Sequence, residues 1–197
     1  METSSEHQER PELDGTTRFI HLGLMVFGIL ALITGFFAGD YMHPHHVGFS
    51  FHKWFGVGLA TFLALRLWHG FSGPQEARLG VWGPYTQERV LFILEDIKSL
   101  LKFQLPKRPP RQGLSGLVQT YGLAAFAWMG ATGTLMFFLM APGRKAKGLL
   151  HLVKEIHEAS WWLAFVFLCI YGGAVILHAF AGQDFWRPMF FFTKRSK

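Results

Sequence analysis

Four stretches of about 20 mostly apolar residues constrain this chain of 197 residues more than any other feature. They cover roughly residues 19–39, 49–71, 119–141 and 158–182. A helix rises about 1.5 Å per residue, so each stretch is long enough to cross a hydrocarbon core about 30 Å thick. Only 16% of the residues are charged, whereas a typical soluble domain has about 25%. We therefore predict an all-α membrane protein, built as a four-helix transmembrane bundle.

The segment 87–105, between the second and third apolar stretches, predicts a further helix. Its apolar residues recur at helical spacing, with acidic and basic residues between them. It is too polar to span a membrane, so we expect an amphipathic helix at the cytoplasmic interface. Two interpretations remain open: the helix covers the end of the bundle, or it contacts a quinone or a partner protein. Polar tails at 1–18 and 184–197 flank the membrane domain at 19–183.

The distribution of lysine and arginine predicts the orientation of the chain. Most of those outside the apolar stretches lie in the two tails and in the segment between the second and third stretches. The positive-inside rule then places both termini in the cytoplasm, in a multi-pass protein of the bacterial inner membrane surrounded by lipid. The net charge of +6 falls in these connecting segments, so membrane topology explains it and nucleic-acid binding does not.

The groups that most enzyme mechanisms require are missing from the sequence. The single cysteine, Cys169, excludes a disulfide, a zinc cluster or an iron–sulfur site built from this chain alone. There is no glycine-rich dinucleotide loop and no nucleophile with an attendant base. Asp and Glu are absent from the interiors of the apolar stretches, which argues against a proton pump or a charge-lined channel.

Histidines lie near the ends of the apolar stretches: His21, His52, His69, His157 and His178. Ionisable groups are costly in lipid and tend to be functional, and imidazole is a common ligand of haem iron. The second and fourth stretches run in the same direction, so His52 and His157 lie at one depth near the outer face. Two imidazoles from two helices at one depth predict a haem site. Gly56 and Gly58 would leave room for the porphyrin.

The remaining polar residues near the membrane have simpler interpretations. A single histidine at a helix end is more often an interfacial residue than a ligand. His69 lies about 260° around its helix from His52, so we interpret it as interfacial. The three histidines in segment 43–46 indicate a solvated outer loop, although such a cluster also suits a metal ion or a partner. Arg66 either reaches the membrane surface or pairs with a haem propionate.

Several short motifs, taken in order, resemble those of a known family. They are RFIH and ITGFFAG in the first stretch, RLWHGFSG at the end of the second, GATGTLMFF in the third and IHEASWWLAF at the start of the fourth. From about Thr17 to Phe190 the chain resembles bacterial cytochrome b561-type proteins. It is most similar to the b-type cytochrome subunits of nickel–iron hydrogenases and formate dehydrogenases.

This resemblance implies two b haems, one near each face. The outer haem would be held by His52 and His157. The inner haem of the family uses the histidine of the first span, here His21, and a histidine of the fourth span at the position that is Tyr171 here. Because His178 follows seven residues later, three readings remain, in order of preference: His21 with His178, His21 with Tyr171, or no haem. His178 also fits an interfacial residue near a quinone site.

The resemblance, and the absence of catalytic groups, indicate electron transfer between a redox partner, one or two haem b groups and the quinone pool. The connecting segments hold no catalytic domain, so we expect the membrane subunit of a larger oxidoreductase rather than a complete enzyme. The alternative is a stand-alone oxidoreductase similar to cytochrome b561 relatives, such as a superoxide:quinone oxidoreductase. A third class is a haem-free membrane protein, which would lack a Soret band.

Overall fold

The computed structural model describes residues 14–39, 45–81, 83–84, 86–106, 108, 111–141 and 143–183. Within these residues the regular structure is helical and there is no strand, which confirms the prediction of an all-α protein. The elements are α1 (Gly15–Phe36), α2 (Val47–Ser72), the short 3₁₀ helices η1 (Gln75–Ala77) and η2 (Leu79–Val81), α3 (Gln87–Leu101), α4 (Gly113–Leu139), α5 (Leu149–Ala159) and α6 (Trp161–Phe180).

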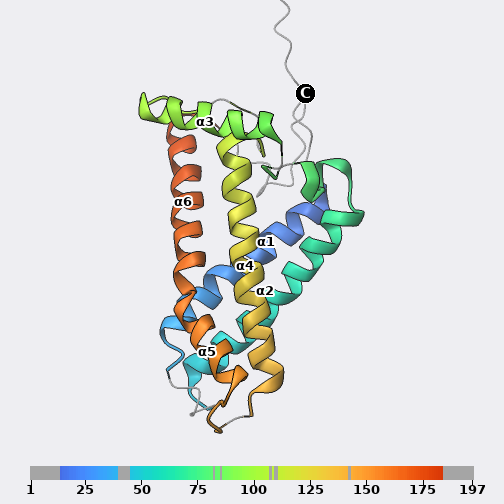
Figure 1. The fold of residues 1–197 in the computed structure, drawn as a ribbon, viewed down its shortest axis with the longest axis vertical. Helices are drawn as coiled ribbons and strands as arrows, with labels where there is room; N and C mark the ends of the chain where they lie inside the picture. The colour runs from blue at the N-terminus through green and yellow to red at the C-terminus, as the bar shows by residue number, and fades with distance from the viewer. Residues whose placement is uncertain are drawn as a thin grey trace, which may run out of the picture.

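The helices α1 and α2 form a hairpin whose members pack along one another (Figure 1). Glycines allow this close approach. A Cβ at Gly23 would clash with the Phe62 ring, and one at Gly58 would clash with the Phe27 ring. The prediction that Gly58 leaves room for a porphyrin is therefore wrong, since Phe27 occupies that space. Nothing lies within 4 Å of an added Cβ at Gly56.

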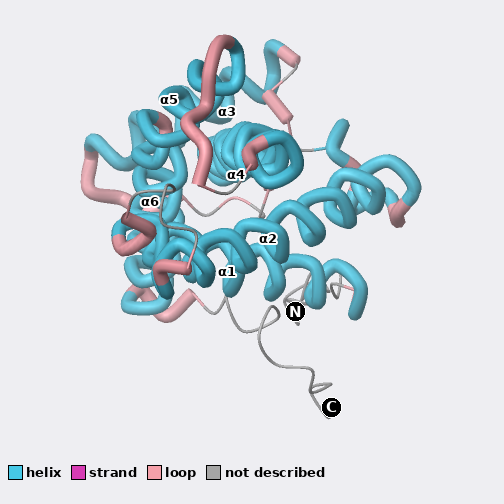
Figure 2. The backbone as a smooth tube through the Cα atoms, turned by 90° about the horizontal axis from the view of Figure 1, so that it is seen from below, coloured by secondary structure: helices cyan, strands magenta, loops and turns pink. Residues whose placement is uncertain are grey.

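The helix α4 is the central packing partner of the other helices. It packs against α2, α3, α5 and α6, and the view in Figure 2 shows it among the other helices. Buried side chains of α2, α4 and α6 meet in a small core made of Leu59, Leu63, Phe126 and Ala164. No large side chain among the described residues is completely buried. This core contains only a small part of the apolar side chains that the structure describes.

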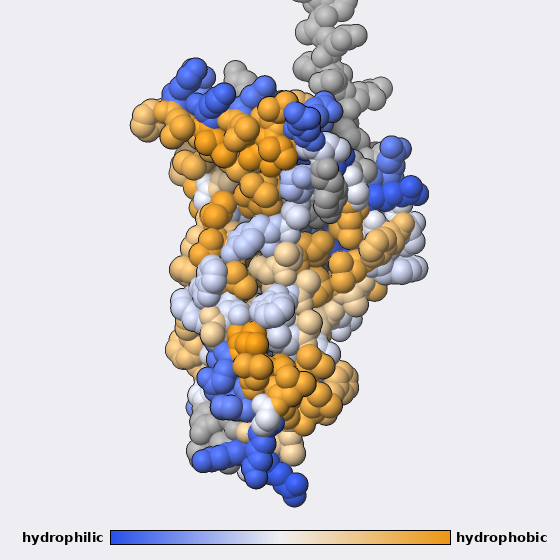
Figure 3. All heavy atoms as spheres, viewed as in Figure 1, coloured by the Kyte–Doolittle hydropathy of each residue, from blue (hydrophilic) through white to orange (hydrophobic). Residues whose placement is uncertain are grey.

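Much of the apolar surface faces outward (Figure 3). Trp68, Phe138 and Phe180 are 68%, 75% and 88% exposed, as expected for side chains that lipid covers. Among the residues that the structure describes, three helical stretches are long and apolar enough to cross a membrane: Gly15–Phe36, Gly113–Leu139 and Leu149–Phe180. The helix α2 is long enough but less apolar, so the predicted second crossing at 49–71, and with it the count of four, stays a prediction.

The helical region that contains the predicted fourth stretch, 158–182, is not continuous. It divides at Ser160 into α5 and α6. The Ser160 hydroxyl donates to the Ile156 carbonyl and accepts a hydrogen bond from the indole N–H of Trp128 on α4, at 3.1 Å. The backbone there forms the tighter bonds of a turn, from Ser160 N–H to the His157 carbonyl and from Leu163 N–H to the Ser160 carbonyl. His157 therefore lies in the last turn of α5, and His178 lies in a different helix, α6.

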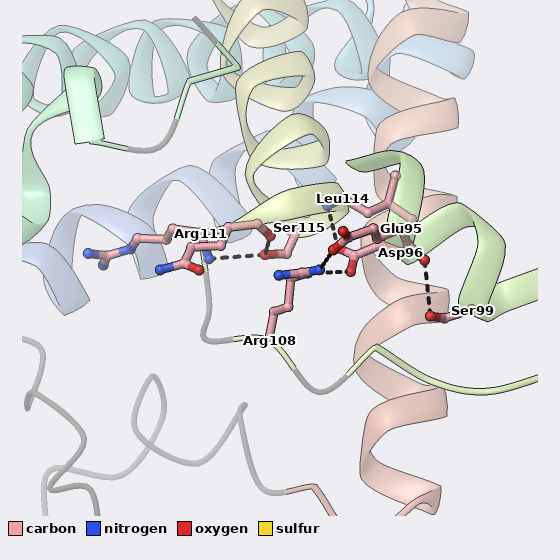
Figure 4. A network of polar contacts seen from close by, with 8 residues as sticks. Glu95, Asp96, Ser99, Arg108, Arg111, Leu114 and Ser115 are labelled. Carbon is pink, nitrogen blue, oxygen red and sulfur yellow. Dashed lines mark hydrogen bonds and ion pairs between the residues drawn. The ribbon is translucent and has the colours of Figure 1, made fainter. Parts of the chain in front are cut away.

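The amphipathic helix α3 lies across one end of the bundle and packs against α4 (Figure 1). One carboxylate attaches it, that of Asp96, which is buried with 4% of its surface exposed. Asp96 accepts hydrogen bonds from Arg108 Nε and from the backbone N–H of Leu114 in the first turn of α4, each at 2.8 Å (Figure 4). The hydrogen bond and charge of Asp96, together with Glu95 beside it, raise the pKa of Arg108 above its usual range. Thus α3 covers this end of the bundle, as one of our two interpretations proposed.

Candidate haem-binding site

Two of the predicted histidines face each other across the bundle. His52 comes from the second turn of α2 and His157 from the last turn of α5. Their ring centres are 6.1 Å apart and their planes make an angle of 61°. Two metal–imidazole bonds of about 2 Å each, plus the distance from each nitrogen to its ring centre, add up to roughly 6 Å. Two imidazoles bound to one metal ion do not have to be coplanar. The angle of 61° is therefore also compatible with an iron ion between the rings.

The protonation state of His52 follows from its hydrogen bond. Its Nδ1 lies 2.9 Å from the backbone carbonyl oxygen of Ala31 on α1. A carbonyl oxygen only accepts hydrogen bonds, so Nδ1 carries the proton and Nε2 keeps its lone pair. No hydrogen bond among the described residues involves Nε2 of His52. Metal-binding histidines have this arrangement, in which the second nitrogen fixes the orientation of the ring.

The same reasoning applies to His157. Its Nδ1 lies 2.8 Å from the hydroxyl oxygen of Thr132 on α4. On a helix, a threonine hydroxyl donates its one proton to a carbonyl of the preceding turn, and the carbonyl oxygens of Trp128 and Met129 lie 2.8 and 3.2 Å from that of Thr132. With its proton used there, the hydroxyl accepts from His157. Nδ1 of His157 is therefore the protonated nitrogen, and its Nε2 is also left with a lone pair. Each ring thus keeps Nε2 for a metal ion, and the 6.1 Å between the ring centres is compatible with one ion shared by both.

Two glycines that we did not predict lie against these rings. A Cβ at Gly35 on α1 would lie 3.3 Å from Cε1 and Nδ1 of His52, and one at Gly133 on α4 would lie 3.2 Å from Cε1 of His157. Both belong to motifs quoted above for the family resemblance, ITGFFAG and GATGTLMFF. The Thr-Gly pair in each motif was the available signal for the site, but only the folded chain shows which ring each pair contacts.

A second pair of aromatic rings lies between α1 and α6. The ring centres of His21 on α1 and Tyr171 on α6 are 6.2 Å apart. His178, two turns beyond Tyr171, has its Nδ1 at 2.8 Å from Oε1 of Gln183. The structure thus brings Tyr171 to His21, and the pairing of His21 with His178 stays a prediction. Arg66 is near enough to His21 to interact with it electrostatically, and it donates a hydrogen bond to the Ala77 carbonyl at 3.1 Å.

His69 lies in the last turn of α2, and its position at the membrane interface stays a prediction. It is buried, with 8% of its surface exposed, and its Nε2 lies 3.1 Å from the hydroxyl of Thr17. That hydroxyl donates to Asp14, the N-cap of α1, so it accepts from Nε2 of His69. The nitrogen that a ligand would offer to iron is already used. His69 therefore joins α2 to the start of α1.

The outer-loop histidines hold no metal site that the structure describes. His43 lies outside the described residues, while His45 and His46 are exposed. Among the described residues no group of three or more His, Cys, Asp or Glu side chains converges on one point. Two imidazoles suffice for haem, since the porphyrin supplies the other four nitrogen ligands of the iron.

Comparison with known proteins identifies the family of the chain. A model of the prokaryotic cytochrome b561 family matches residues 12–192, which include all four histidines proposed as ligands. No curated protein and no solved structure matches the chain. The match covers far more than half of the 197 residues. The chain therefore belongs to the prokaryotic cytochrome b561 family, which consists of membrane-bound b-type cytochromes that bind haem b and transfer electrons.

Proposed function

We propose that this chain is the cytochrome b subunit of a larger membrane oxidoreductase and passes electrons between a redox partner protein and the quinone pool. One observation carries the proposal. His52 and His157 face each other at 6.1 Å between ring centres, and each uses Nδ1 for a hydrogen bond. This arrangement supports one haem b held by these two residues.

The residues around the pair bind and orient the cofactor. When bound, haem supplies the one-electron chemistry that no side chain of this protein provides. The carbonyl of Ala31 and the hydroxyl of Thr132 hold the two imidazoles in one orientation. Gly35 and Gly133 let the helix backbones approach the rings. The surrounding apolar helices exclude water, which is one way in which a protein tunes a haem potential.

A second haem at His21 belongs to the same proposal. Its other axial ligand is His178 or Tyr171, and the contact of His21 with Tyr171 supports the latter. A tyrosinate is an established haem ligand, although a less common one than histidine. Arg66, close to His21, carries the positive charge that a haem propionate would need.

The orientation follows from the positive-inside rule. With both termini in the cytoplasm, His52 and His157 lie near the outer face of the bacterial inner membrane, and His21 lies near the cytoplasmic face. The redox partner then docks on the outer side. This partner is the catalytic subunit of the complex and supplies the substrate chemistry. Nickel–iron hydrogenases and formate dehydrogenases, whose b-type subunits the sequence resembles, are built in this way.

Haem content measured for single variants tests the proposal. We expect His52→Ala and His157→Ala each to lower the ratio of haem to polypeptide by one, measured as the pyridine haemochromogen. His45→Ala is the control, because its side chain is exposed in the loop beside the site. A ratio that stays at the wild-type value in both variants would exclude the site. The same assay on His21→Ala, His178→Ala and Tyr171→Phe identifies the ligands of the inner haem.

A further inference from the structure

We propose that Thr132 is a positioning residue that fixes His157 and sets the strength with which this imidazole donates to iron. This inference rests on the proposed haem site and adds a residue of α4 that binds no metal itself. Thr132 is buried, with 7% of its surface exposed. Three polar atoms lie within hydrogen-bond distance of its hydroxyl: Nδ1 of His157 and the carbonyl oxygen of Trp128, each at 2.8 Å, and the carbonyl oxygen of Met129 at 3.2 Å.

Thr132 belongs to a row of polar contacts along one face of α4. Tyr121, Trp128 and Thr132 are spaced by seven and four residues, so they project from the same side of the helix. Tyr121 donates to the Leu163 carbonyl at 2.9 Å, and Trp128 donates to the Ser160 hydroxyl at 3.1 Å. All three therefore bond the segment where α5 ends and α6 begins. The contact of Thr132 with this segment is its hydrogen bond to His157.

The two imidazoles of the pair are held differently. His52 donates to a backbone carbonyl, which no side-chain substitution removes. His157 donates to a hydroxyl, which a single substitution removes. A hydrogen bond from Nδ1 makes an imidazole more electron-rich at Nε2 and raises its basicity as a ligand. A more basic axial ligand favours the oxidised iron, so the Thr132 hydroxyl is expected to lower the midpoint potential of this haem.

Removal of the hydroxyl has a predictable consequence. In Thr132→Val and Thr132→Ala the N–H of His157 is left without its partner, in a site that water reaches poorly. The ring becomes a weaker donor and turns more freely. We expect the midpoint potential to rise, by about 59 mV if the preference for the ferric form weakens tenfold. Thr132→Ser keeps a hydroxyl at the same place and is expected to restore the wild-type value.

The experiment uses the full-length chain, purified in detergent with its haem. The haem lost in His157→Ala identifies the signal to follow, and an optical redox titration gives its potential. Thr120→Val is the matched control, since its hydroxyl, also on α4, bonds the Gly116 carbonyl and no other residue that the structure describes. A raised potential and altered g values of the low-spin ferric haem in Thr132→Val, with wild-type values in Thr132→Ser and Thr120→Val, support the role. If Thr132→Val does not accumulate, Thr132→Ala is measured in its place, because it adds no bulk next to the ring.

Two other results have definite meanings. A potential and g values in both hydroxyl-free variants equal to those of the wild type would overturn the role of Thr132, while the haem site itself would stand. Haem retained at the wild-type ratio in His157→Ala would instead overturn the proposed function. The haem-to-polypeptide ratio separates these results without any measurement of electron-transfer activity.

Discussion

Hydrogen bonds to the imidazole nitrogens separate three histidines of the bundle into two kinds. His52 and His157 use Nδ1 and leave Nε2 to a ligand. His69 uses Nε2 for Thr17 and is a structural residue. The sequence placed all three near a membrane boundary, but depth and spacing do not reveal which nitrogen is occupied. That information lies in carbonyl and hydroxyl groups of other helices, such as the Ala31 carbonyl.

Asp14 provides a prediction at this scale. Its carboxylate caps α1 by accepting hydrogen bonds from the backbone and side chain of Thr17, and it lies 3.7 Å from Nε2 of His69. We expect Asp14→Ala to lower the free energy of unfolding by about 1 kcal/mol, the usual value of an N-cap. Denaturant titration in detergent, followed by circular dichroism, measures this change. Asp14→Asn is the control, because asparagine caps a helix about as well.

The pH dependence of this difference is also determined. Burial raises the pKa of Asp14, but the hydrogen bonds from Thr17 and the nearby His69 outweigh burial and hold that pKa below its ordinary value of 3.8. A carboxyl group whose pKa is lower in the folded state contributes stability above pH 3.8, and loses it as the pH falls through the folded pKa. The difference between the wild type and Asp14→Ala should therefore shrink below about pH 4. A difference that grows in acid would contradict the capping role.

At the scale of single elements, the approximate positions of the long helices were predictable. The end of α5 and the start of α6 were not. The apolar period of segment 87–105 predicted α3, which the structure places at Gln87–Leu101. The division between α5 and α6 left no signal, because Ser160 is neither glycine nor proline and lies within a good helix sequence. At the break Ser160 accepts a hydrogen bond from Trp128, which is 32 residues away. Contacts between distant segments can override local helix preference, and local sequence does not reveal them.

The attachment of α3 depends on Asp96, and it predicts unequal effects for two adjacent carboxylates. Asp96→Ala removes the partner of Arg108 Nε and of the Leu114 N–H. We expect a loss of about 1–3 kcal/mol, the cost of leaving such groups unpaired. Glu95 also pairs with Arg108, but its side chain is 59% exposed, so Glu95→Ala should cost less than about 1 kcal/mol.

Hydrogen exchange measures this difference where it should occur. In Asp96→Ala, backbone amides of α3 and of the first turn of α4 should exchange faster than in the wild type, while those of α1 and α2 keep their protection. Glu95→Ala serves as the matched control, since it changes the neighbouring residue of the same helix. Equal exchange of α3 in both variants would show that Asp96 does not hold this helix.

For the whole molecule, two Thr-Gly pairs relate the two halves of the site. Gly35 on α1 lies against the His52 ring, whose Nδ1 bonds the Ala31 carbonyl, and Thr132 and Gly133 on α4 lie against the His157 ring. The Thr34 hydroxyl bonds the carbonyls of Leu30 and Ala31. The helical class, the approximate helix positions and the pair His52–His157 could be predicted, because they depend on hydrophobic length and on depth. The Thr-Gly contacts and the proximity of Tyr171 to His21 could not, because they depend on how the helices rotate against each other.

The number of membrane crossings depends on α2. We predict that α2 also crosses the membrane, which makes four crossings in total. Its 26 residues extend about 39 Å, and it packs along α1, which is apolar enough to cross. The polar groups that lower its hydropathy have partners in the protein: His52 bonds Ala31, Arg66 bonds Ala77 and His69 bonds Thr17. Buried pairing of this kind removes much of the cost of placing such groups in lipid.

Single cysteines placed at the two ends of α2 test this prediction. His45 precedes the helix and Gln75 follows it, and both are exposed. In a background where Cys169 is replaced by serine, His45→Cys and Gln75→Cys should react with a membrane-impermeant maleimide from opposite sides of inner-membrane vesicles. A cysteine in place of Arg144, beyond α4, is the control and should react from the same side as His45→Cys. If His45→Cys and Gln75→Cys react from the same side, α2 does not cross, and His52 and His69 then lie near one face of the membrane.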